Sequence, residues 1–309
     1  MNQPTVEKAK MFPVMLTPFT KDGDVDYAAL EQLIAFYEEG GADGLFAVCQ
    51  SSEIFFLSLS ERVKVATFVK EHAHVPVVAS GHVAWGLEEQ ARELKAIADT
   101  GVDALIFITN RFCAQGEAPD AFKRRLDYLL ERLDPALPLG FYECPMPYKR
   151  LLSLEELKYA AFTGRFRFMK DTCCDIATIR DRLDVLRGSK MALYNANTAT
   201  LLESLRAGAA GYSGVMASFH PELYAYLLKN YAAEPQKCEK LQALLTVCAF
   251  IEKQYYPVNA KYHLSALKGL DMTINSRTLN PLGMSELYKD EVRQMDALVE
   301  AFKQAEGIQ

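Results

Sequence analysis

Short apolar runs alternate with longer amphipathic stretches over the first two thirds of the chain. The runs do not alternate apolar with polar residues, which is typical of strands buried on both faces of a parallel sheet. The stretches between them repeat apolar residues at helical spacing, as at Leu87, Ala91, Leu94 and Ala98. This pattern predicts helices between strands near residues 12–16, 44–48, 75–80, 104–108, 139–142, 168–170, 192–195 and 211–215.

Three segments share one kind of junction, in which glycine ends a helical stretch directly before an apolar strand. They are GGADGLFAV (40–48), TGVDALIFI (100–108) and GAAGYSGV (208–215). Glycine is the favoured residue just after a last helical turn. Eight strands that alternate with helices in this way predict an α/β fold, a (β/α)8 TIM barrel over residues 1–220.

The strand signal stops near residue 220. Beyond it, EKLQALLTVCAFIEKQ and GMSELYKDEVRQMDALVEAFKQ have the pattern of helices. No low-complexity linker separates them from the barrel sequence. We therefore predict that residues 221–309 form a C-terminal helical extension packed on the barrel.

The composition narrows the class of partner. The chain has 309 residues and a formal net charge of -6, which provides no basic field for a phosphate backbone and predicts no nucleic-acid partner. Its polar start, MNQPTVEKAK, and the shortness of its apolar runs predict neither a leader nor a membrane span. Seven scattered cysteines, an odd number, argue against a disulfide framework. These features predict a cytoplasmic protein.

Four polar side chains are predicted to meet at one end of the barrel. The C-terminal ends of the strands in such barrels face the active site. Lys170 and Tyr142 end the sixth and fifth predicted strands, Ser51 follows the second, and Asn195 ends the seventh.

Lys170 stands in FMKDT, within an apolar run. A lysine amine is nucleophilic only when it is neutral, and a desolvated pocket favours the neutral form. Such an amine is suited to attack a ketone and form a Schiff base. The residues alone leave open a lysine that reaches to water or pairs with Asp171.

Tyr142 and Ser51 likewise each have a catalytic and a structural interpretation. A phenol beside the amine can relay the protons that imine formation requires, but Tyr142 is equally consistent with an aromatic residue at the barrel rim. Ser51 can hydrogen-bond a carboxylate or that phenol, or belong to a helix-start turn.

Several motifs together resemble the dihydrodipicolinate synthase / N-acetylneuraminate lyase family. They are PVMLTPFTKDGDVD near the start, CQSSE after the second predicted strand, FYECP after the fifth, FMKDT in the sixth, AGAAGYSGVMASF, and RTLNPL near the C-terminus. The resemblance spans nearly the whole chain. The separation of Tyr142 and Lys170 also agrees with the family.

The resemblance implies a class I aldolase-type barrel that is a homotetramer or homodimer. Lys170 would form the imine with pyruvate or another 2-oxo acid, and Tyr142 would move the protons. Ser51 would lie where the family has a hydroxyl linked to that tyrosine, while backbone amides of the CQSSE turn would hold the substrate carboxylate. No cofactor and no metal is implied, because the protonated imine is itself the electron sink.

The chain departs from the family pattern in two loops. In the CQSSE turn, Gln50 replaces a hydroxyl residue and Ser52 a glycine, which predicts a bulkier carboxylate site. The aromatic residue that the synthases lend across a dimer interface to their proton relay aligns with Phe112, which has no hydroxyl. The relay is then shorter or rerouted. Arg111, next to it, is either a contact for an acidic substrate or a surface arginine.

Further candidates follow the last strands. Asn197 and Thr198 in YNANTAT and Ser213 after the eighth predicted strand are expected to line the pocket. His82 ends a predicted strand, so it either faces the mouth or is packed or solvated. His220, before a proline, has the pattern of a helix-entry residue.

The leading reading is a lyase or aldolase that acts on 2-oxo acids through a lysine imine. A dehydratase of 2-oxo-3-deoxy sugar acids would use the same imine to expel a hydroxyl. A third reading is a non-catalytic barrel that binds a small 2-oxo acid, which Gln50 and Phe112 favour and Lys170 and Tyr142 oppose.

We also expect poor activity as a dihydrodipicolinate synthase or as a sialic acid lyase. The synthases place an arginine for the second substrate's carboxylate where this chain has Pro147. The lyases place paired carboxylates for sugar hydroxyls where this chain has Thr198 and Ala199. The expected second substrate is therefore short or partly apolar.

Overall fold

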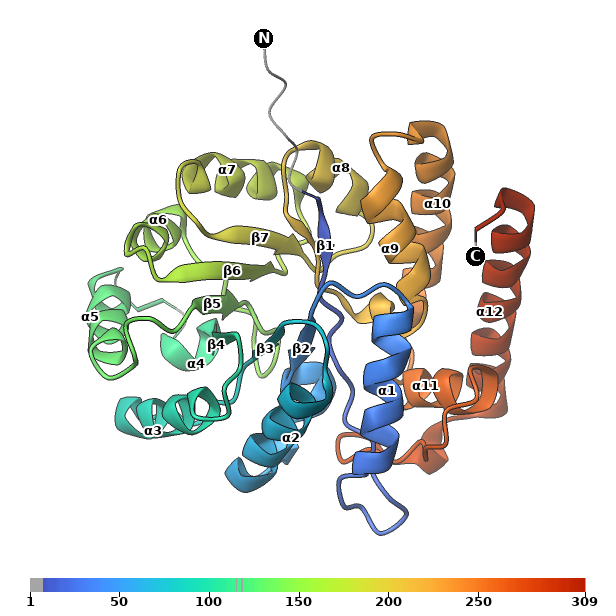
Figure 1. Cartoon of the computed structure of the whole chain (residues 1–309), viewed down its shortest axis with the longest axis horizontal. Coiled ribbons are helices and arrows are strands. Elements are labelled where there is room, and N and C mark those ends of the chain that lie inside the picture. The colour runs from blue at the N-terminus through green and yellow to red at the C-terminus, as the bar shows by residue number, and fades with distance from the viewer. Residues whose placement is uncertain (1–7, 115, 118, 309) are drawn as a thin grey trace.

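The barrel consists of a single sheet of eight parallel strands. The structure, a computed structural model, describes residues 8–114, 116–117 and 119–308. The strands lie in the order β1-β8-β7-β6-β5-β4-β3-β2. They are β1 (Lys10–Met11), β2 (Leu45–Ala47), β3 (Val77–Ala79), β4 (Ala104–Ile108), β5 (Leu139–Tyr142), β6 (Phe166–Asp171), β7 (Ala192–Asn195) and β8 (Gly211–Tyr212). Figure 1 shows these strands at the centre, surrounded by helices.

Backbone hydrogen bonds after β1 close the barrel. Met15 N donates to Phe46 O at 3.0 Å, and Phe46 N donates to Pro13 O at 2.9 Å. An isolated parallel bridge joins Val14 to Phe46. The regular strand therefore lies at Lys10–Met11, before the predicted residues 12–16, because Pro13 has no N–H to continue a regular ladder.

Helices connect successive strands, as the apolar periodicity predicts. On the barrel they are α1 (Tyr27–Glu39), α2 (Leu59–His72), α3 (Leu87–Ala98), α4 (Thr109–Phe112), α5 (Pro119–Leu130), α6 (Leu154–Phe162), α7 (Ile176–Leu186) and α8 (Leu201–Arg206). Two short 3-10 helices, η1 (Gln50–Ser52) and η2 (Ile54–Phe56), follow β2. Helix α6 begins with a reciprocal cap between the Ser153 side chain and Glu156.

Aromatic rings fill the barrel below the ends of its central strands. Phe168 stacks on Tyr194 with 4.5 Å between ring centroids, and Phe12 meets Phe168 edge-on at 5.3 Å. Phe46 lies edge-on to Phe168 at 5.9 Å and to Tyr142 at 5.5 Å. Lys170 follows Phe168 by two residues and shares its side of β6. The lysine therefore stands on an apolar floor.

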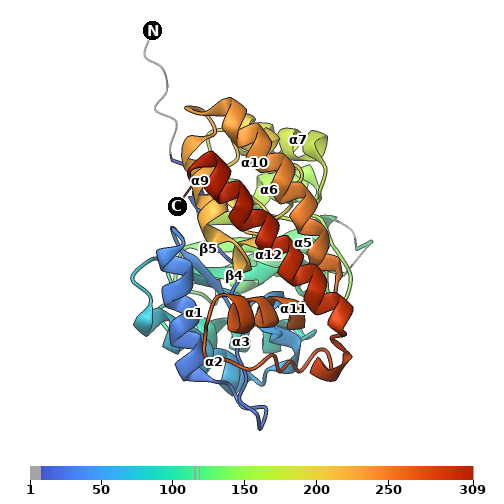
Figure 2. The ribbon, with the colours of Figure 1, turned by 90° about the vertical axis from the view of Figure 1, so that its right-hand side faces the viewer.

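The remaining chain is mostly helical and lies on one flank of the barrel (Figure 2). It comprises η3 (Val215–Ser218), α9 (Pro221–Asn230), α10 (Pro235–Cys248), η4 (Ala249–Lys253), α11 (Val258–Tyr262), the π-helix η5 (His263–Leu267), η6 (Pro281–Gly283) and α12 (Glu286–Glu306). Helix α9 packs on β1 and β8. We keep the division at residue 220 as a proposal.

A buried ion pair ties this flank to the turn after β2. Lys261 Nζ lies 2.7 Å from Glu53 Oε1, and both side chains are almost fully buried. Glu53 Oε2 also accepts hydrogen bonds from the backbone N–H groups of Arg277 and Thr278. The glutamate of CQSSE therefore holds the C-terminal RTLNPL segment against the barrel.

Among the described helices, none combines the length and the apolar character that crossing a membrane requires. Most of the polar start, residues 1–7, lies outside the described residues.

Candidate active site

Lys170 is the penultimate residue of β6, and its side chain is buried at the C-terminal mouth of the barrel. It lies beside Tyr142 of β5 and Tyr194 of β7 in the sheet register. Its Nζ is 4.5 Å from the centroid of the Tyr142 ring and 5.6 Å from that of Phe46. Within the described part of the chain this amine forms no ion pair. The alternative that Lys170 pairs with Asp171 is not what the structure shows.

Burial sets the protonation state of this amine. It lowers the pKa of Lys170 from 10.5 to about 8, and the nearby Cys49, Cys144 and Glu252 only partly oppose the shift. At pH 7 this raises the neutral fraction roughly 300-fold over an ordinary lysine. A neutral amine in a dry pocket is the form that attacks a carbonyl carbon.

Tyr142 presents its phenol at the neighbouring strand end. Burial raises the pKa of Tyr142 well above its ordinary value, and the Cys144 thiol beside it acts in the same direction. The phenol is therefore protonated at neutral pH and can donate a proton. Cys144 in turn donates from Sγ to Gln50 Oε1 at 3.4 Å, which links this strand end to the turn after β2.

Ser51 lies in η1 with its side chain buried. Its hydroxyl is close enough to that of Tyr256 to lower the phenol's pKa, although burial raises the pKa of Tyr256 well above its ordinary value. The two hydroxyls are not hydrogen-bonded to each other: the buried Tyr256 Oη has no hydrogen-bond partner among the described residues.

A buried ion network fixes the two strand ends. Arg182 of α7 makes paired bonds to Glu143, with Nη2 to Oε1 at 2.7 Å and Nη1 to Oε2 at 2.9 Å, and it also pairs with Asp171. All three side chains are essentially inaccessible to solvent. Glu143 follows Tyr142 and Asp171 follows Lys170, so one guanidinium clamps the backbone on which both reactive groups stand.

Other predicted pocket residues of the CQSSE turn divide into two kinds. Gln50 is half-buried and holds Cys144, as described above. Ser52, by contrast, donates from Oγ to Met15 O at 2.7 Å and accepts from Cys49 N at 3.1 Å. The Ser52 hydroxyl thus holds the turn together by bonding its backbone.

The polar side chains predicted to line the pocket after β7 mostly hydrogen-bond within their own turn. Asn195 donates to Thr200 Oγ1 at 2.9 Å and to Ser204 Oγ at 3.0 Å, and Asn197 Oδ1 accepts from Thr200 N at 3.1 Å. These bonds keep Asn195, which was predicted to face the mouth, inside the turn after its strand. The turn is thus held by its own side chains.

Thr198 lies in a buried hydroxyl cluster. Its Oγ1 is 3.0 Å from Tyr212 Oη and 2.8 Å from Tyr224 Oη. Ser213 follows β8 and is buried, and its Oγ has no partner among the described residues. Of the two, only Ser213 therefore has an unengaged hydroxyl.

The neighbouring side chains of Phe112 and Arg111 lie in different surroundings. Phe112 is fully buried in an aromatic cluster with Phe107, Phe122 and Phe141, which the structure does not bring together with Tyr142 and Lys170. The Arg111 guanidinium lies 4.1 Å from the Trp85 ring centroid. It forms no ion pair within the described residues.

The two candidate histidines are both buried inside the protein. His82 is fully buried, and its Nε2 accepts from Ile108 N at 2.6 Å. Burial lowers the pKa of His82 to about 4, so it is neutral. His220 stands at the N-cap of α9, which confirms the predicted helix entry.

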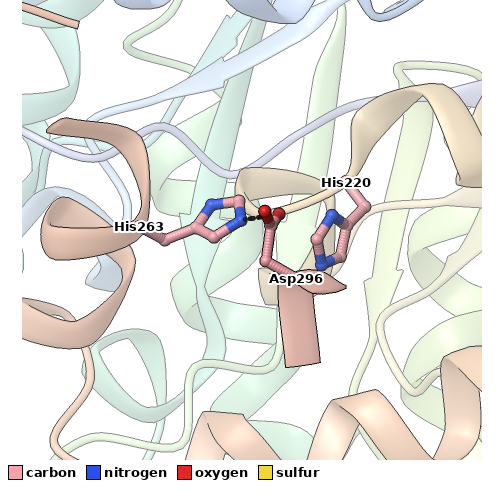
Figure 3. Close-up of side chains that lie close together, drawn as sticks. All are labelled: His220, His263 and Asp296. Atoms are coloured by element: carbon pink, nitrogen blue, oxygen red, sulfur yellow. Dashed lines mark hydrogen bonds and ion pairs between the residues drawn. The ribbon is translucent and has the colours of Figure 1, made fainter. Parts of the chain in front are cut away.

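One group of side chains has the makings of a cation site. Ligand atoms of His220, His263 and Asp296 lie within 4.8 Å of one another, between α9, the π-helix and α12 (Figure 3). His263 Nε2 is 2.9 Å from Asp296 Oδ1, but Lys268 Nζ lies 2.8 Å from the same oxygen. An ammonium thus already compensates this carboxylate. We interpret the group as a polar tie that holds α12 on the barrel.

The barrel and the buried lysine and tyrosine at its mouth can be compared with known proteins. The chain belongs to the dihydrodipicolinate synthetase family, which it matches over residues 7–302. The 4-hydroxy-tetrahydrodipicolinate synthase of Methanosarcina barkeri is 24% identical over 292 residues, covering 93% of this chain and 98% of that protein. The N-acetylneuraminate lyase of Escherichia coli is 27% identical over 234 residues, covering 74% and 76%.

Solved structures agree on the fold. A dihydrodipicolinate synthase from Acinetobacter baumannii, complexed with pyruvate, is 25% identical with a TM-score of 0.83 and covers 98% of this chain and 100% of that chain. A prophage protein of the same family from E. coli K12, also in complex with pyruvate, is 21% identical with a TM-score of 0.83, covering 96% and 98%. The predicted family and the predicted barrel are both confirmed.

Sequence reasoning missed four residues around the mouth. Two of them carried a signal that was not used: Glu143 directly follows the fifth predicted strand, and Arg182 lies in the helical stretch after the sixth. Glu252 and Tyr256 come from the C-terminal flank. Nothing in their local sequence indicates the barrel mouth, because that contact depends on how the extension folds back.

Proposed function

We propose that the protein is a lyase that forms a Schiff base between Lys170 and pyruvate or another 2-oxo acid. The observation that carries this is the buried, unpaired Lys170 amine against the Tyr142 ring. The pyruvate complex of the Acinetobacter baumannii relative supports the choice of ligand. Reduction with borohydride in the presence of pyruvate tests the proposal, because it converts an imine into a stable secondary amine.

Tyr142 is proposed to protonate the departing oxygen during imine formation. Tyr142→Phe removes only the phenol oxygen and should slow imine formation by ~10²–10⁴-fold, the usual scale for a positioned proton donor. Stopped-flow measurement with pyruvate gives the rate, and circular dichroism checks that the fold persists. Tyr159→Phe is the matched control, because its hydroxyl bonds Asp127 on the barrel's exterior. Equal rates in wild type and Tyr142→Phe would show that another group supplies the proton.

The second substrate is proposed to be short or partly apolar. The Thr198 hydroxyl is already bonded to two tyrosines, and its neighbour Ala199 has no polar group to hold a sugar hydroxyl. Pro147 likewise offers no charge for a second carboxylate. A lost charge-assisted bond of ~1.5–3 kcal/mol costs at least about tenfold in the use of such a substrate.

We therefore expect low efficiency with pyruvate plus aspartate semialdehyde and with N-acetylneuraminate. The measurement is kcat/KM of the purified protein on each, beside a panel of small aldehydes and 2-oxo-3-deoxy sugar acids. A value near ~10⁴ M⁻¹s⁻¹ or above on either would place it among true substrates and contradict the expectation. The unpaired Arg111 is the group whose substitution, as Arg111→Met, should then raise KM.

We propose a homotetramer or a homodimer as the assembly. Large apolar side chains remain exposed on two faces of the single chain. They are Leu151, Leu154 and Phe162 around α6, and Val247, Phe250 and Leu298 on α10, η4 and α12. Val247, Phe250 and Leu298 line one common groove, and apolar surface grouped in this way is typical of a protein interface. Sedimentation equilibrium should give a mass of two or four chains, and a single-chain mass at micromolar concentration would contradict it.

A further inference from the structure

His220 is buried without a hydrogen-bond partner on either nitrogen of its ring. It is the N-cap residue of α9 and is fully buried, and both Nδ1 and Nε2 lack a partner among the described residues. A neutral imidazole carries one N–H donor and one acceptor nitrogen, and leaving both unbonded in the interior costs free energy. A buried polar group in this state calls for a partner from outside the chain, such as a water molecule or an ion.

Two further groups that can bind a metal ion lie beside this ring. His263 of the π-helix η5 and Asp296 of α12 bring their ligand atoms within 4.8 Å of each other and of His220 (Figure 3). His263 Nε2 is 2.9 Å from Asp296 Oδ1, and the two histidine rings meet edge-on with 5.0 Å between their centroids. His263 Nδ1 also has no partner among the described residues. Two imidazoles and one carboxylate from three different elements therefore converge on one point.

The three donors suit a divalent transition-metal ion, above all Zn²⁺. Imidazole nitrogens and one carboxylate oxygen are common zinc ligands, whereas Ca²⁺ and Mg²⁺ prefer oxygen ligands alone. Burial lowers the pKa of both His220 and His263, so each ring is neutral at pH 7 and keeps the lone pair that a metal ion needs. Burial raises the pKa of Asp296, but the bonds from His263 and Lys268 outweigh it and keep the carboxylate ionised.

Lys268 is the competitor for this position. Its Nζ lies 2.8 Å from Asp296 Oδ1 and 3.2 Å from Glu300 Oε1. The ammonium compensates the carboxylate but leaves both nitrogens of His220 without a partner. A divalent ion would supply that positive charge, bind both imidazoles, and leave Lys268 its second partner, Glu300. The side chains of Asp296 and Lys268 are 16% and 19% accessible, which gives an ion a way in beside α12.

We propose that His220, His263 and Asp296 bind one divalent transition-metal ion, which displaces Lys268 and fastens α12 to the barrel. The polar tie described above is the form that these side chains take without the ion. Water completes the coordination, because three side chains leave one tetrahedral position open. The ion takes no part in the proposed Schiff-base chemistry at Lys170, and the site stands whether or not that chemistry occurs.

Titration with ZnCl₂ tests the site, after a chelator has removed any metal from the purified protein. Isothermal titration calorimetry should show a strong site that binds one ion per chain. The midpoint of thermal unfolding should rise with the Zn²⁺ concentration, because the ion binds the folded chain in preference to the unfolded one. Absence of a strong site in the wild-type protein would overturn the proposal. Since cysteine thiolates also bind Zn²⁺, variants must locate the ion.

His220→Phe removes the ligand that makes no hydrogen bond in the polar tie. Phenylalanine keeps a planar ring in the same buried position, so the variant should fold, which circular dichroism checks. Loss of a group that only orients a metal ligand already costs roughly 10–100-fold in affinity, so loss of a ligand should weaken Zn²⁺ binding by at least about 100-fold. His74→Phe is the matched control, because His74 is 86% accessible and pairs with Glu38, and it should leave the affinity unchanged.

Lys268→Met tests the displacement of the ammonium, which a purely structural tie would not show. The ion no longer has to break the bond between Lys268 and Asp296, so Zn²⁺ should bind roughly tenfold more tightly, the equivalent of one charge-assisted hydrogen bond. Lys289→Met is the control for the lost charge. It removes a lysine from α12 that pairs with Glu286 at 2.7 Å, and it should not change the affinity.

The variants and the borohydride experiment separate the outcomes. Equal Zn²⁺ affinity in wild type and His220→Phe would mean that the ion binds other groups, such as the cysteines, and the assignment would be wrong. If His220→Phe does not fold, an unchanged affinity in Lys268→Met is enough to overturn it. The pyruvate adduct on Lys170 should form at the same rate with and without Zn²⁺, so failure of the metal site and failure of the Schiff-base function are distinguishable.

Discussion

Lys170→Ala should abolish the adduct that borohydride traps with pyruvate. Wild-type protein should gain the mass of one reduced pyruvate on one lysine, and the variant none. The physical reason is that imine formation needs a neutral amine, and burial lowers the pKa of Lys170 to about 8. Intact-protein mass spectrometry measures the adduct, and peptide mapping locates it.

Lys149→Ala is the matched control for this experiment. Its Nζ donates to Thr172 O at 2.7 Å, just beyond the end of β6, and Lys149 is exposed, whereas Lys170 is buried. This variant should be labelled as wild type is. Equal labelling of the Lys170→Ala protein would mean that another amine forms the imine, and the proposed site would then be wrong.

Arg182→Met should lower the free energy of unfolding by about 3–5 kcal/mol, the usual cost of removing one partner from a buried ion pair. Methionine keeps most of the apolar length of arginine, so the loss reports the charge. It leaves the carboxylates of Glu143 and Asp171 buried without a cation. Acid should restore part of the lost stability, because protonation removes the unpaired negative charges. Urea unfolding at two pH values measures both effects.

Arg187→Met is the control, since it removes an arginine from the end of the same helix. Its ion pair with Asp184 spans 2.7 Å but is exposed, with 82% and 64% of the two side chains accessible. An exposed pair contributes at most about 1 kcal/mol. Comparable losses in both variants would show that the clamp on Tyr142 and Lys170 has no special strength. A loss confined to Arg182→Met should be accompanied by slower imine formation, because the strand ends would then be free to shift.

Much of the barrel could be predicted from local pattern. Strands buried on both faces leave unbroken apolar runs, so β4 at Ala104–Ile108 and β5 at Leu139–Tyr142 coincide with their predicted ranges. The first strand was predicted in the wrong place, because a proline interrupts the backbone hydrogen bonding there. Pro13 is evident in the sequence. The hydrogen bonds between residues 13–15 and Phe46 that close the barrel depend on the tertiary structure, which brings the segment after β1 beside β2.

The site divides in the same way. The sequence by itself determined that Lys170 and Tyr142 stand together, because both end adjacent parallel strands and such ends meet at one mouth. The sequence did not show which of the polar side chains hydrogen-bond to other parts of the protein. Ser52 and Thr198 carry hydroxyls suited to a substrate, but the structure gives them protein partners that lie 37 and 26 residues away in the sequence.

Only the tertiary structure decided what surrounds the reactive pair. The sequence placed Glu143 and Asp171 on strand ends, but their shared partner, Arg182, comes from a helix packed behind them. Tyr256 and Glu252 belong to a flank whose local pattern shows only helices. They reach the mouth because the chain folds back across the barrel, and long-range contacts of this kind leave no periodic signal in a sequence. The apolar pattern determined the barrel, whereas the packing of distant elements decided which polar groups meet inside it.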